Sequence, residues 1–335
     1  MGNCISVWNS ALLIVAGVSV GLALYYRNEK IVQRQRRNEL AMSLFKLRGS
    51  ILEIRSSNDR SSIFKPRPSD VFIVTYPKSG TTWMSQVCHM LRGGDMNFGD
   101  ITEVCPWDAR AEISGQDLND DQIKNPRIFT SHLHYEEIAK GGKYIYVARN
   151  PEDVLVSFFH FIPGVRGLKQ DDLSLQQFAD SIFIKGAGKF GTIWDQFMSW
   201  YKVKDDSNVL WVFYEDMKCD LKNQIERVAT FLAIPTNVRN ERILEALEKS
   251  SFKFMSSKEH KHHFDGSFTI SKQRVVMGIP EESTIRVSKV RQGMTGMQSQ
   301  IPSEILERLN EQWKQKITLK TNHLDYKSFR NKFFL

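Results

Sequence analysis

Cysteine is scarce in this chain. Cys4, Cys88, Cys105 and Cys219 lie far apart, and no two of them form a CxxC pair. The spacing excludes a cysteine zinc signature and a disulfide framework, and it is typical of a reducing compartment. The sequence also lacks any Asn-x-Ser/Thr acceptor for N-glycosylation, which weakly favours a cytosolic domain. We predict no metal site, because the run His260–His263 has no cysteine or carboxylate partner at a zinc spacing.

Most of the chain carries almost no net charge. The 335 residues carry a net charge of +8. Residues 27–67 hold 11 Lys and Arg against 4 Asp and Glu, so they account for all but one unit of that charge. A nucleic-acid-binding surface needs its basic stripe on the folded domain. A nucleic-acid partner is therefore not expected.

Charged side chains are absent altogether from residues 1–26. The apolar run Ser10–Tyr26, extended back to Val7, is about long enough to cross a bilayer as a helix, and basic residues follow it at once. The positive-inside rule then places the rest of the chain in the cytosol. A cleaved signal peptide is the weaker interpretation, because the basic residues follow the apolar run. A buried core helix is weaker still, since the run has no polar face.

A second signal competes at the same end of the chain. Met1–Ser6 fits the pattern for myristoylation at Gly2, with Cys4 available for palmitate. Acylation conflicts with a helix that exports the N-terminus, so the mode of attachment stays open, although either mode leaves the domain in the cytosol. We predict a membrane anchor at 1–26, a basic linker at 27–65 and one folded domain at 66–335.

Short β-branched runs alternate with helical patterns in the folded domain. Strands are predicted at Val71–Tyr76, Tyr144–Ala148 and Val209–Phe213. Amphipathic helices are predicted at Thr81–Leu91, Glu152–Phe161, Trp194–Lys202, Leu221–Leu232 and Ser303–Lys316, with a further helical stretch around Arg36–Arg48. Strands that alternate with helices indicate the α/β class, with a mainly parallel sheet flanked by helices on both faces.

The segment Tyr76–Trp83 follows the first predicted strand and opens the first predicted helix. Such a turn binds anions, because backbone N–H groups converge there and the helix dipole adds positive charge. It is not a Walker A loop, since Lys78 precedes the glycine and the first glycine of GxxxxGK[ST] is absent. This argues against a kinase that uses ATP. An ordinary capped turn would not explain Lys, Gly, two Thr and Trp together.

Tyr76–Trp83, with the lead-in Arg67–Val71, resembles the 5′-phosphosulfate loop of the cytosolic sulfotransferase family. The resemblance implies a fold related to P-loop kinases that binds the sulfuryl donor PAPS (3′-phosphoadenosine 5′-phosphosulfate). It implies that Lys78 contacts the oxygen between sulfur and phosphorus and that Trp83 stacks on the adenine. The loop residues between them would complete the binding site: Ser79, Gly80, Thr81 and Thr82.

Arg149–Ser157 resembles the family's 3′-phosphate motif, with Arg149 and Ser157 as its ligands. The spacing is physically reasonable, because Ser157 lies about two turns into the helix that follows Arg149. Tyr214, Ser250 and Phe252 resemble further nucleotide contacts, although each alone would be interpreted as ordinary packing.

Ile128–Leu133 resembles the segment that carries the family's catalytic histidine, which corresponds to His132. An imidazole with a pKa near neutrality suits a general base. Many family members carry Lys two residues earlier, where Thr130 stands here. The hydroxysteroid-type subfamily also tends to lack that Lys.

The resemblance weakens near the C-terminus. The family usually has Arg-Lys-Gly, two residues, then Gly-Asp-Trp-Lys-Asn, whereas this chain has Arg291-Gln292-Gly293 followed by Met294–Gln300. We expect Arg291, Gln292 and Gly293 to line the 3′-phosphate site, with weaker binding because Gln292 replaces a cation. The family's dimer motif is not recognisable in Ile301–Gln312, so a homodimer stays open.

These motifs predict metal-free transfer of a sulfuryl group from PAPS to a hydroxyl or amine of a small acceptor. His132 and Lys78 are the expected catalytic residues. Phe158, Phe159, Phe161 and residues near Trp107 are candidates for an apolar acceptor pocket, and a membrane anchor favours a lipophilic acceptor such as a sterol. The alternative is a membrane-anchored protein that binds PAP or PAPS with little or no transfer. Sulfation followed by elimination also stays open.

Overall fold

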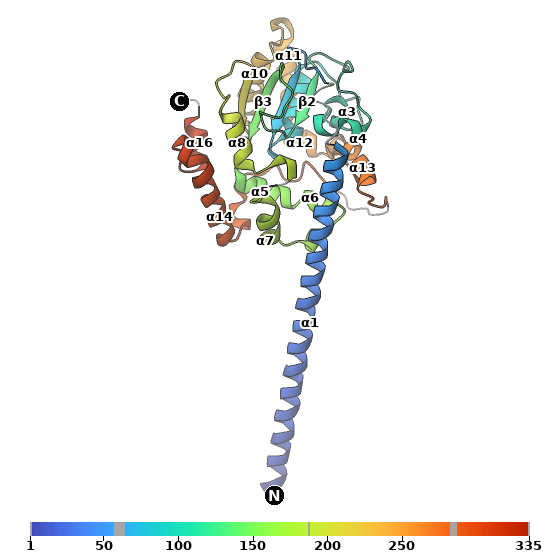
Figure 1. The fold of residues 1–335 in the computed structure, drawn as a ribbon, viewed down its shortest axis with the longest axis vertical. Helices are drawn as coiled ribbons and strands as arrows, with labels where there is room; N and C mark the ends of the chain where they lie inside the picture. Colours follow the sequence, from blue (N-terminus) through green and yellow to red (C-terminus); the bar gives the residue numbers. More distant parts are fainter. Residues whose placement is uncertain (1, 57–63, 187, 282–286, 334–335) are drawn as a thin grey trace.

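The structure is a computed structural model that describes residues 2–56, 64–186, 188–281 and 287–333. The side chains of residues 2–18, 21, 54–56 and 189 lie outside this description. A parallel sheet of four strands lies at the centre of the globular part, in the order β2-β1-β3-β4 (Figure 1). The strands are β1 (Val71–Thr75), β2 (Ile128–Ser131), β3 (Lys143–Ala148) and β4 (Val209–Phe213).

The three predicted strands are confirmed, and β2 is the strand that the sequence pattern did not single out. Val71 pairs with Ile128 on one side and with Lys143 on the other, and Tyr144 pairs with Val209. All four strands are therefore aligned with their carboxyl ends at one edge. The predicted α/β class with a mainly parallel sheet is confirmed.

The two faces of the sheet carry separate hydrophobic cores, because successive side chains of a strand point to opposite sides. In β1, Phe72 and Val74 belong to one core, while Val71 and Ile73 belong to the other. The first core is covered mainly by α5 (Pro151–Phe159), α8 (Ile193–Tyr201), α14 (Ser303–Trp313) and α16 (Tyr326–Lys332). The second is covered mainly by α2 (Thr81–Leu91), α10 (Leu221–Phe231) and α11 (Thr236–Lys249).

The predicted helices are present with small differences at their ends. The helix predicted at Ser303–Lys316 ends as an α-helix at Trp313 and continues as a π-helical turn, Lys314–Thr318. The other α-helices are α3 (Ile101–Val104), α4 (Ala111–Ser114), α6 (Ile162–Val165), α7 (Leu175–Phe178), α9 (Tyr214–Cys219), α12 (Phe252–Ser256), α13 (Ser267–Val276) and α15 (Leu319–Thr321).

A single helix, α1 (Gly2–Ser56), forms the N-terminal part of the chain. Its 55 residues correspond to a length of about 80 Å, and Figure 1 shows most of it extending away from the globular part. Near its C-terminal end, Ala41 and Phe45 join the core, and Leu52 packs against Met277 and Ile279. Part of the segment predicted as a linker therefore packs on the domain.

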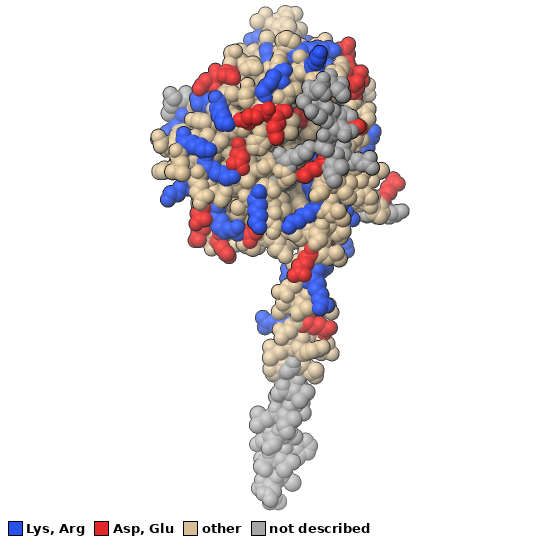
Figure 2. All heavy atoms as spheres, in the orientation of Figure 1, with Lys and Arg blue, Asp and Glu red and all other residues tan. Residues whose placement is uncertain are grey.

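The predicted anchor falls largely outside the described side chains, since those of residues 1–18 are not described. In the part of the chain that is described, no helix is both long and apolar enough to span a membrane. On the face shown in Figure 2, Lys and Arg alternate with Asp and Glu over the domain. This agrees with the nearly neutral charge that the sequence assigns to residues 68–335.

Candidate active site

A cavity of about 520 Å³ lies at the carboxyl edge of the sheet. Its wall includes residues that closely follow each of the four strands: Lys78 after β1, His132 after β2, Arg149 after β3 and Tyr214 after β4. Ligands of parallel α/β sheets bind outside these strand ends. The cavity is therefore in the expected position for a substrate site.

The loop between β1 and α2 presents an open helix N-terminus to this cavity. Lys78 and Gly80 both have positive φ angles, 73° and 121°. A Cβ on Gly80 would lie 3.0 Å from the Tyr214 ring, so both the backbone angle and the space favour glycine. Helix α2 begins at Thr81 with no side-chain cap and no acidic residue in its first turn. Its first N–H groups are thus available to an anion.

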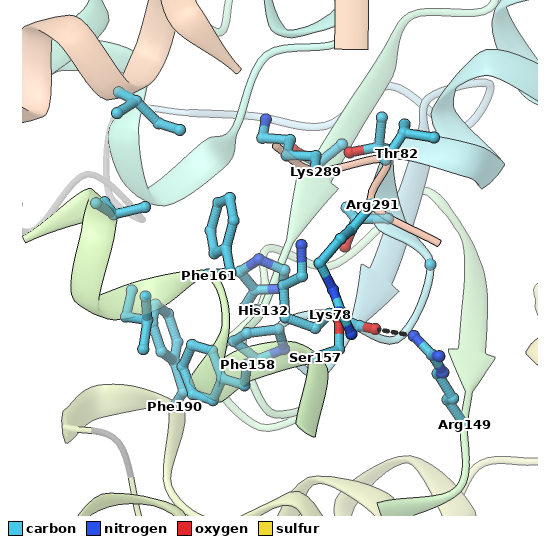
Figure 3. A pocket seen from close by; sticks show the side chains of 18 of the residues that line it. Lys78, Thr82, His132, Arg149, Ser157, Phe158, Phe161, Phe190, Lys289 and Arg291 are labelled. Atoms are coloured by element: carbon cyan, nitrogen blue, oxygen red, sulfur yellow. Dashed lines mark hydrogen bonds between the residues drawn. The ribbon is translucent and has the colours of Figure 1, made fainter. Parts of the chain in front are cut away.

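Positively charged side chains gather at this loop. Lys78, Arg149 and Arg291 all line the cavity (Figure 3). Burial, together with the positive charges of Lys289, Arg149 and Arg291, lowers the pKa of Lys78 to about 7. Positive groups that lower the pKa of a neighbouring amine in this way form a site that an anion would stabilise.

Arg149 is held by the backbone on both sides of the cavity. Its guanidinium donates to the carbonyl oxygens of Lys78 at 2.9 Å and Met294 at 2.8 Å, and it stacks 4.0 Å from the Tyr214 ring. Among the described residues, the buried Arg149 Nε has no hydrogen-bond partner. The Oγ of Ser250 is also buried without one. Unpaired buried donors are costly, so these atoms suit a ligand that carries phosphate oxygens.

Aromatic side chains also line the cavity near the anion loop. The Trp83 indole donates to the carbonyl oxygen of Ser250 at 2.7 Å and meets the Tyr214 ring edge-on. Phe252 is 40% exposed, and a Cβ on Gly293 would lie 2.7 Å from its ring. An exposed aromatic side chain beside a cavity offers a surface on which a flat ring can stack.

His132 lines the same cavity and is tied to β1. Its Nδ1 lies 2.7 Å from the carbonyl oxygen of Thr75, and its ring meets Trp107 and Phe190 edge-on. The amide of Gln196 donates to the carbonyl oxygens of both Thr75 and His132, at 3.1 and 2.8 Å. Burial lowers the pKa of His132 to about 4, and nearby cations lower it while the Thr75 hydrogen bond opposes the shift. The imidazole is therefore neutral near pH 7.

Beyond His132 the cavity becomes apolar. Phe158, Phe161, Ile162, Val165 and Phe190 line it. The Lys78 Nζ lies 3.9 Å from the centre of the Phe161 ring, which marks the boundary between the cationic and apolar parts. The prediction of Phe159 as a lining residue is wrong, because its ring packs against Phe178 instead.

The structure brings together nearly all the residues that the sequence nominated. The cavity is lined by His132, Lys78, Gly80, Thr81, Thr82, Trp83, Arg149, Ser157, Tyr214, Ser250, Phe252, Arg291, Gln292 and Gly293. Ser79 does not line it; this side chain is buried, and its Oγ has no partner among the described residues. The individual roles of the residues that line the cavity are predictions.

Sequence reasoning missed three contributions to the site. Gln196 lies on a predicted amphipathic helix, and we assigned it no role. A polar residue on the buried face of that helix was the signal that could have indicated one. Lys289, two residues before Arg291, lines the cavity as well. The last turns of α1 also line it, and nothing in the linker-like composition of 27–65 indicated this.

A family model described as a sulfotransferase domain matches residues 68–321, most of the chain. The chain belongs to the sulfotransferase family. The amine sulfotransferase of Oryctolagus cuniculus is 37% identical over 180 residues, which are 50% of this chain and 58% of that protein. Sulfotransferase 2B1 of Mus musculus is 34% identical over 200 residues, 57% of each chain. This sulfotransferase-family chain thus spans a little over half the length of these relatives.

A longer match is found with sulfotransferase 1E1 of Mus musculus, which is 30% identical over 274 residues, 76% of this chain and 85% of that protein. Among solved structures, mouse sulfotransferase SULT7A1 complexed with PAP has a TM-score of 0.57 at 23% identity, covering 82% of this chain and 91% of that one. Retinol dehydratase in complex with androsterone and PAP also has a TM-score of 0.57, at 20% identity, covering 77% and 82%. These likenesses show that the fold is that of the sulfotransferases.

Proposed function

We propose that this chain transfers a sulfuryl group from PAPS to a hydroxyl or amine of a small, lipophilic acceptor. The observation that carries the proposal is the pairing of an open, cationic anion loop at the end of β1 with a neutral, partly buried imidazole held to the same strand end. The loop suits a phosphate and sulfate donor, and the imidazole suits an acceptor that must lose a proton. Both groups face one cavity whose remaining wall is apolar.

The residues around the anion loop fit the donor. Lys78 lies where it can neutralise the charge that develops on the leaving phosphate, with the N–H groups at the start of α2 beside it. Arg149, Ser157 and Arg291 line the cavity near Lys78 and suit the 3′-phosphate (Figure 3). Trp83, Tyr214 and Phe252 offer aromatic surfaces to the adenine. Bound PAPS would supply the activated sulfuryl group, and the described residues offer no cluster of three metal-ligating side chains.

His132 is the proposed general base. Its Nδ1 donates to the carbonyl oxygen of Thr75, so Nε2 carries the free lone pair. This lone pair accepts the proton that the hydroxyl or amine of the acceptor loses. As that O–H or N–H bond breaks, the acceptor atom forms a bond to sulfur, and the bond from sulfur to the phosphate oxygen breaks. Lys78 stabilises the phosphate that leaves, and positioning and charge stabilisation supply most of the catalysis.

We also propose that the N-terminal segment holds the enzyme at a membrane, with the domain on the cytosolic side. Support comes from the charge-free sequence of residues 1–26 and the basic residues after it. On the described part of α1, Leu22, Leu24, Tyr25 and Tyr26 are all more than half exposed, which suits an interface with lipid. A lipophilic acceptor would be available at such a location.

Membrane attachment is tested by fractionation of cells that express the full chain. We expect the protein in the membrane fraction and its domain open to protease added outside sealed microsomes. Release by Gly2→Ala would identify acylation as the anchor, while resistance to carbonate extraction in that variant would identify a spanning helix. A protein recovered in the soluble fraction would contradict the proposal.

Catalysis is tested by transfer of labelled sulfate from PAPS to a mixed pool of phenols, sterols and amines. We expect labelled product with the full chain and its loss in His132→Ala, with PAP binding retained in both proteins. PAP binding without product on any acceptor would instead favour the alternative, a membrane-anchored nucleotide-binding protein. Gln292, which lines the cavity where the family usually has a cation, would then be the first residue to replace by Lys.

A further inference from the structure

The last turns of α1 form one wall of the active-site cavity. Lys46, Gly49, Ser50 and Glu53 line it, and Phe45 adjoins them. Their spacing of i, i+3, i+4 and i+7 places them along one helical face. The wall is therefore a continuous stripe of α1 and not a chance contact of isolated side chains.

Two arginines of the domain hold this wall in place. The Arg166 guanidinium donates to the carbonyl oxygen of Phe45 and lies 4.3 Å from the centre of the Phe45 ring. A Cβ on Gly49 would lie 1.9 Å from a nitrogen of that guanidinium, so glycine leaves the room for it. Arg110 donates to the carbonyl oxygen of Leu52 at 3.1 Å. The helix is thus a fixed part of the site.

The wall faces the apolar part of the cavity, where the acceptor has to lie. A Cβ on Gly188 would lie 1.7 Å from the Glu53 carboxylate, which places Glu53 against the short turn Gly188–Phe190. Phe190 ends that turn, and its ring centre lies 5.5 Å from that of His132. The anion loop and Arg149 belong to other elements. A change on the α1 stripe therefore acts on the acceptor before it acts on the nucleotide.

The chemistry of the wall differs from that of its surroundings. Ile162, Val165 and Ile182 give the adjacent lining an apolar character, whereas Lys46, Ser50 and Glu53 are polar. The negative charge of Glu53 favours the charged forms of Arg110 and Arg166, whose pKa burial lowers to about 10. Polar groups at the edge of an apolar cavity are stabilised by a ligand that hydrogen-bonds to them.

We propose that Lys46–Glu53 of α1 is the acceptor-selecting wall, and that the preferred acceptors are apolar alcohols or amines with a second hydrogen-bonding group. This inference rests on the proposed transfer of a sulfuryl group from PAPS to the acceptor. The wall determines which acceptors bind, so the affinity for the acceptor tests it without any measurement of turnover. One helix then carries both the segment proposed to attach to the membrane and the surface that selects the acceptor.

Ser50 and Ser43 provide a matched pair of variants. Both are exposed, and each hydroxyl donates to the carbonyl oxygen four residues earlier, at 3.1 and 3.0 Å. Ser50 lines the cavity and Ser43 does not. We would measure binding of a tritiated steroid diol to the full chain in lipid nanodiscs saturated with PAP, with empty nanodiscs subtracted.

Ser50→Phe is expected to weaken diol binding by about tenfold or more, because the new ring fills the space beside the wall. Ser43→Phe is expected to bind the diol as the unaltered chain does, and PAP affinity should be the same in all three proteins. Equal diol affinity in the two variants, or no diol binding by the unaltered chain, would overturn the proposal. A chain that transfers no sulfate but loses diol binding on Ser50→Phe would refute the proposed reaction and support the wall.

The polar character of the wall is tested with a steroid mono-ol of the same skeleton. The unaltered chain should bind the diol several-fold more tightly than the mono-ol, as one additional hydrogen bond provides. Lys46→Met and Ser50→Val keep the side-chain size while removing polar groups, and they should reduce this preference. A preference that is unchanged in both variants would refute the proposed selection by hydrogen bonding.

Discussion

The Nδ1 atom of His132 lies 2.7 Å from the backbone carbonyl oxygen of Thr75, the last residue of β1. A carbonyl oxygen only accepts, so Nδ1 carries the proton and Nε2 is left as the basic nitrogen. The contact therefore selects the tautomer of a candidate base. It also ties that base to the strand that leads directly into the anion loop.

The pH dependence of kcat/KM should report the low pKa of His132. Burial lowers that pKa to about 4 from an ordinary value of 6.5. The base must be neutral, so activity is present above the pKa and is lost as the pH falls through it. We expect kcat/KM for the acceptor to hold constant as the pH falls through 6.5, and to decline only nearer the lowered value. An acid limb centred at 6.5 would contradict the lowered pKa and the neutral imidazole.

The affinity for PAP should decrease as the pH rises above neutrality. The pKa of Lys78 in the free protein is about 7, and an anion favours the charged amine, so binding raises that pKa. The attraction is thus present below pH 7 and weakens above it, by at most about tenfold per pH unit. Titration calorimetry from pH 6 to 9 would measure this. Lys78→Arg should bind with less pH dependence, because a guanidinium stays charged.

Gln196 should act as a positioning residue for His132. Its amide donates to the carbonyl oxygens of Thr75 and His132, and it is fully buried. Gln196→Met retains the volume but loses both hydrogen bonds, and a small displacement of the base lowers kcat by about 10- to 100-fold. The KM for PAPS should be unchanged. A fall in kcat accompanied by an equal loss of PAP affinity would indicate a general structural role instead.

The ion pair between Asp70 and Arg127 should be important for stability. Arg127 donates to both carboxylate oxygens, at 2.9 and 2.6 Å, and both side chains are at most 1% exposed. Asp70→Ala leaves a buried, unpaired guanidinium and should lower the free energy of unfolding by about 3–5 kcal/mol. Denaturant titration would measure this loss. Asp121→Asn, which removes the exposed partner of Arg67, is the control and should have no measurable effect.

Local patterns were sufficient to predict three of the four strands, the main helices and most of the residues that gather at the edge of the sheet. Val71–Thr75 is a β-branched run flanked by turn residues, and Tyr76–Trp83 follows it directly in the chain. Adjacent residues stay adjacent in space, so a strand, a loop and a helix can be derived from sequence. Parallel strands share a carboxyl edge, and the residues that follow them, such as His132 and Arg149, are therefore brought together.

The α1 wall, Gln196 and Lys289 could be found only in the tertiary structure. The α1 wall and Lys289 line the cavity, and Gln196 supports it through the backbone of Thr75 and His132. Each contribution depends on packing between segments that lie far apart in the chain. The Arg166 guanidinium over Gly49 is one example: neither residue belongs to a motif, and their contact depends on how α1 docks on the residue that follows α6. The sequence by itself determined the chemistry of the anion loop and its base. Long-range packing determined which other residues enclose the acceptor.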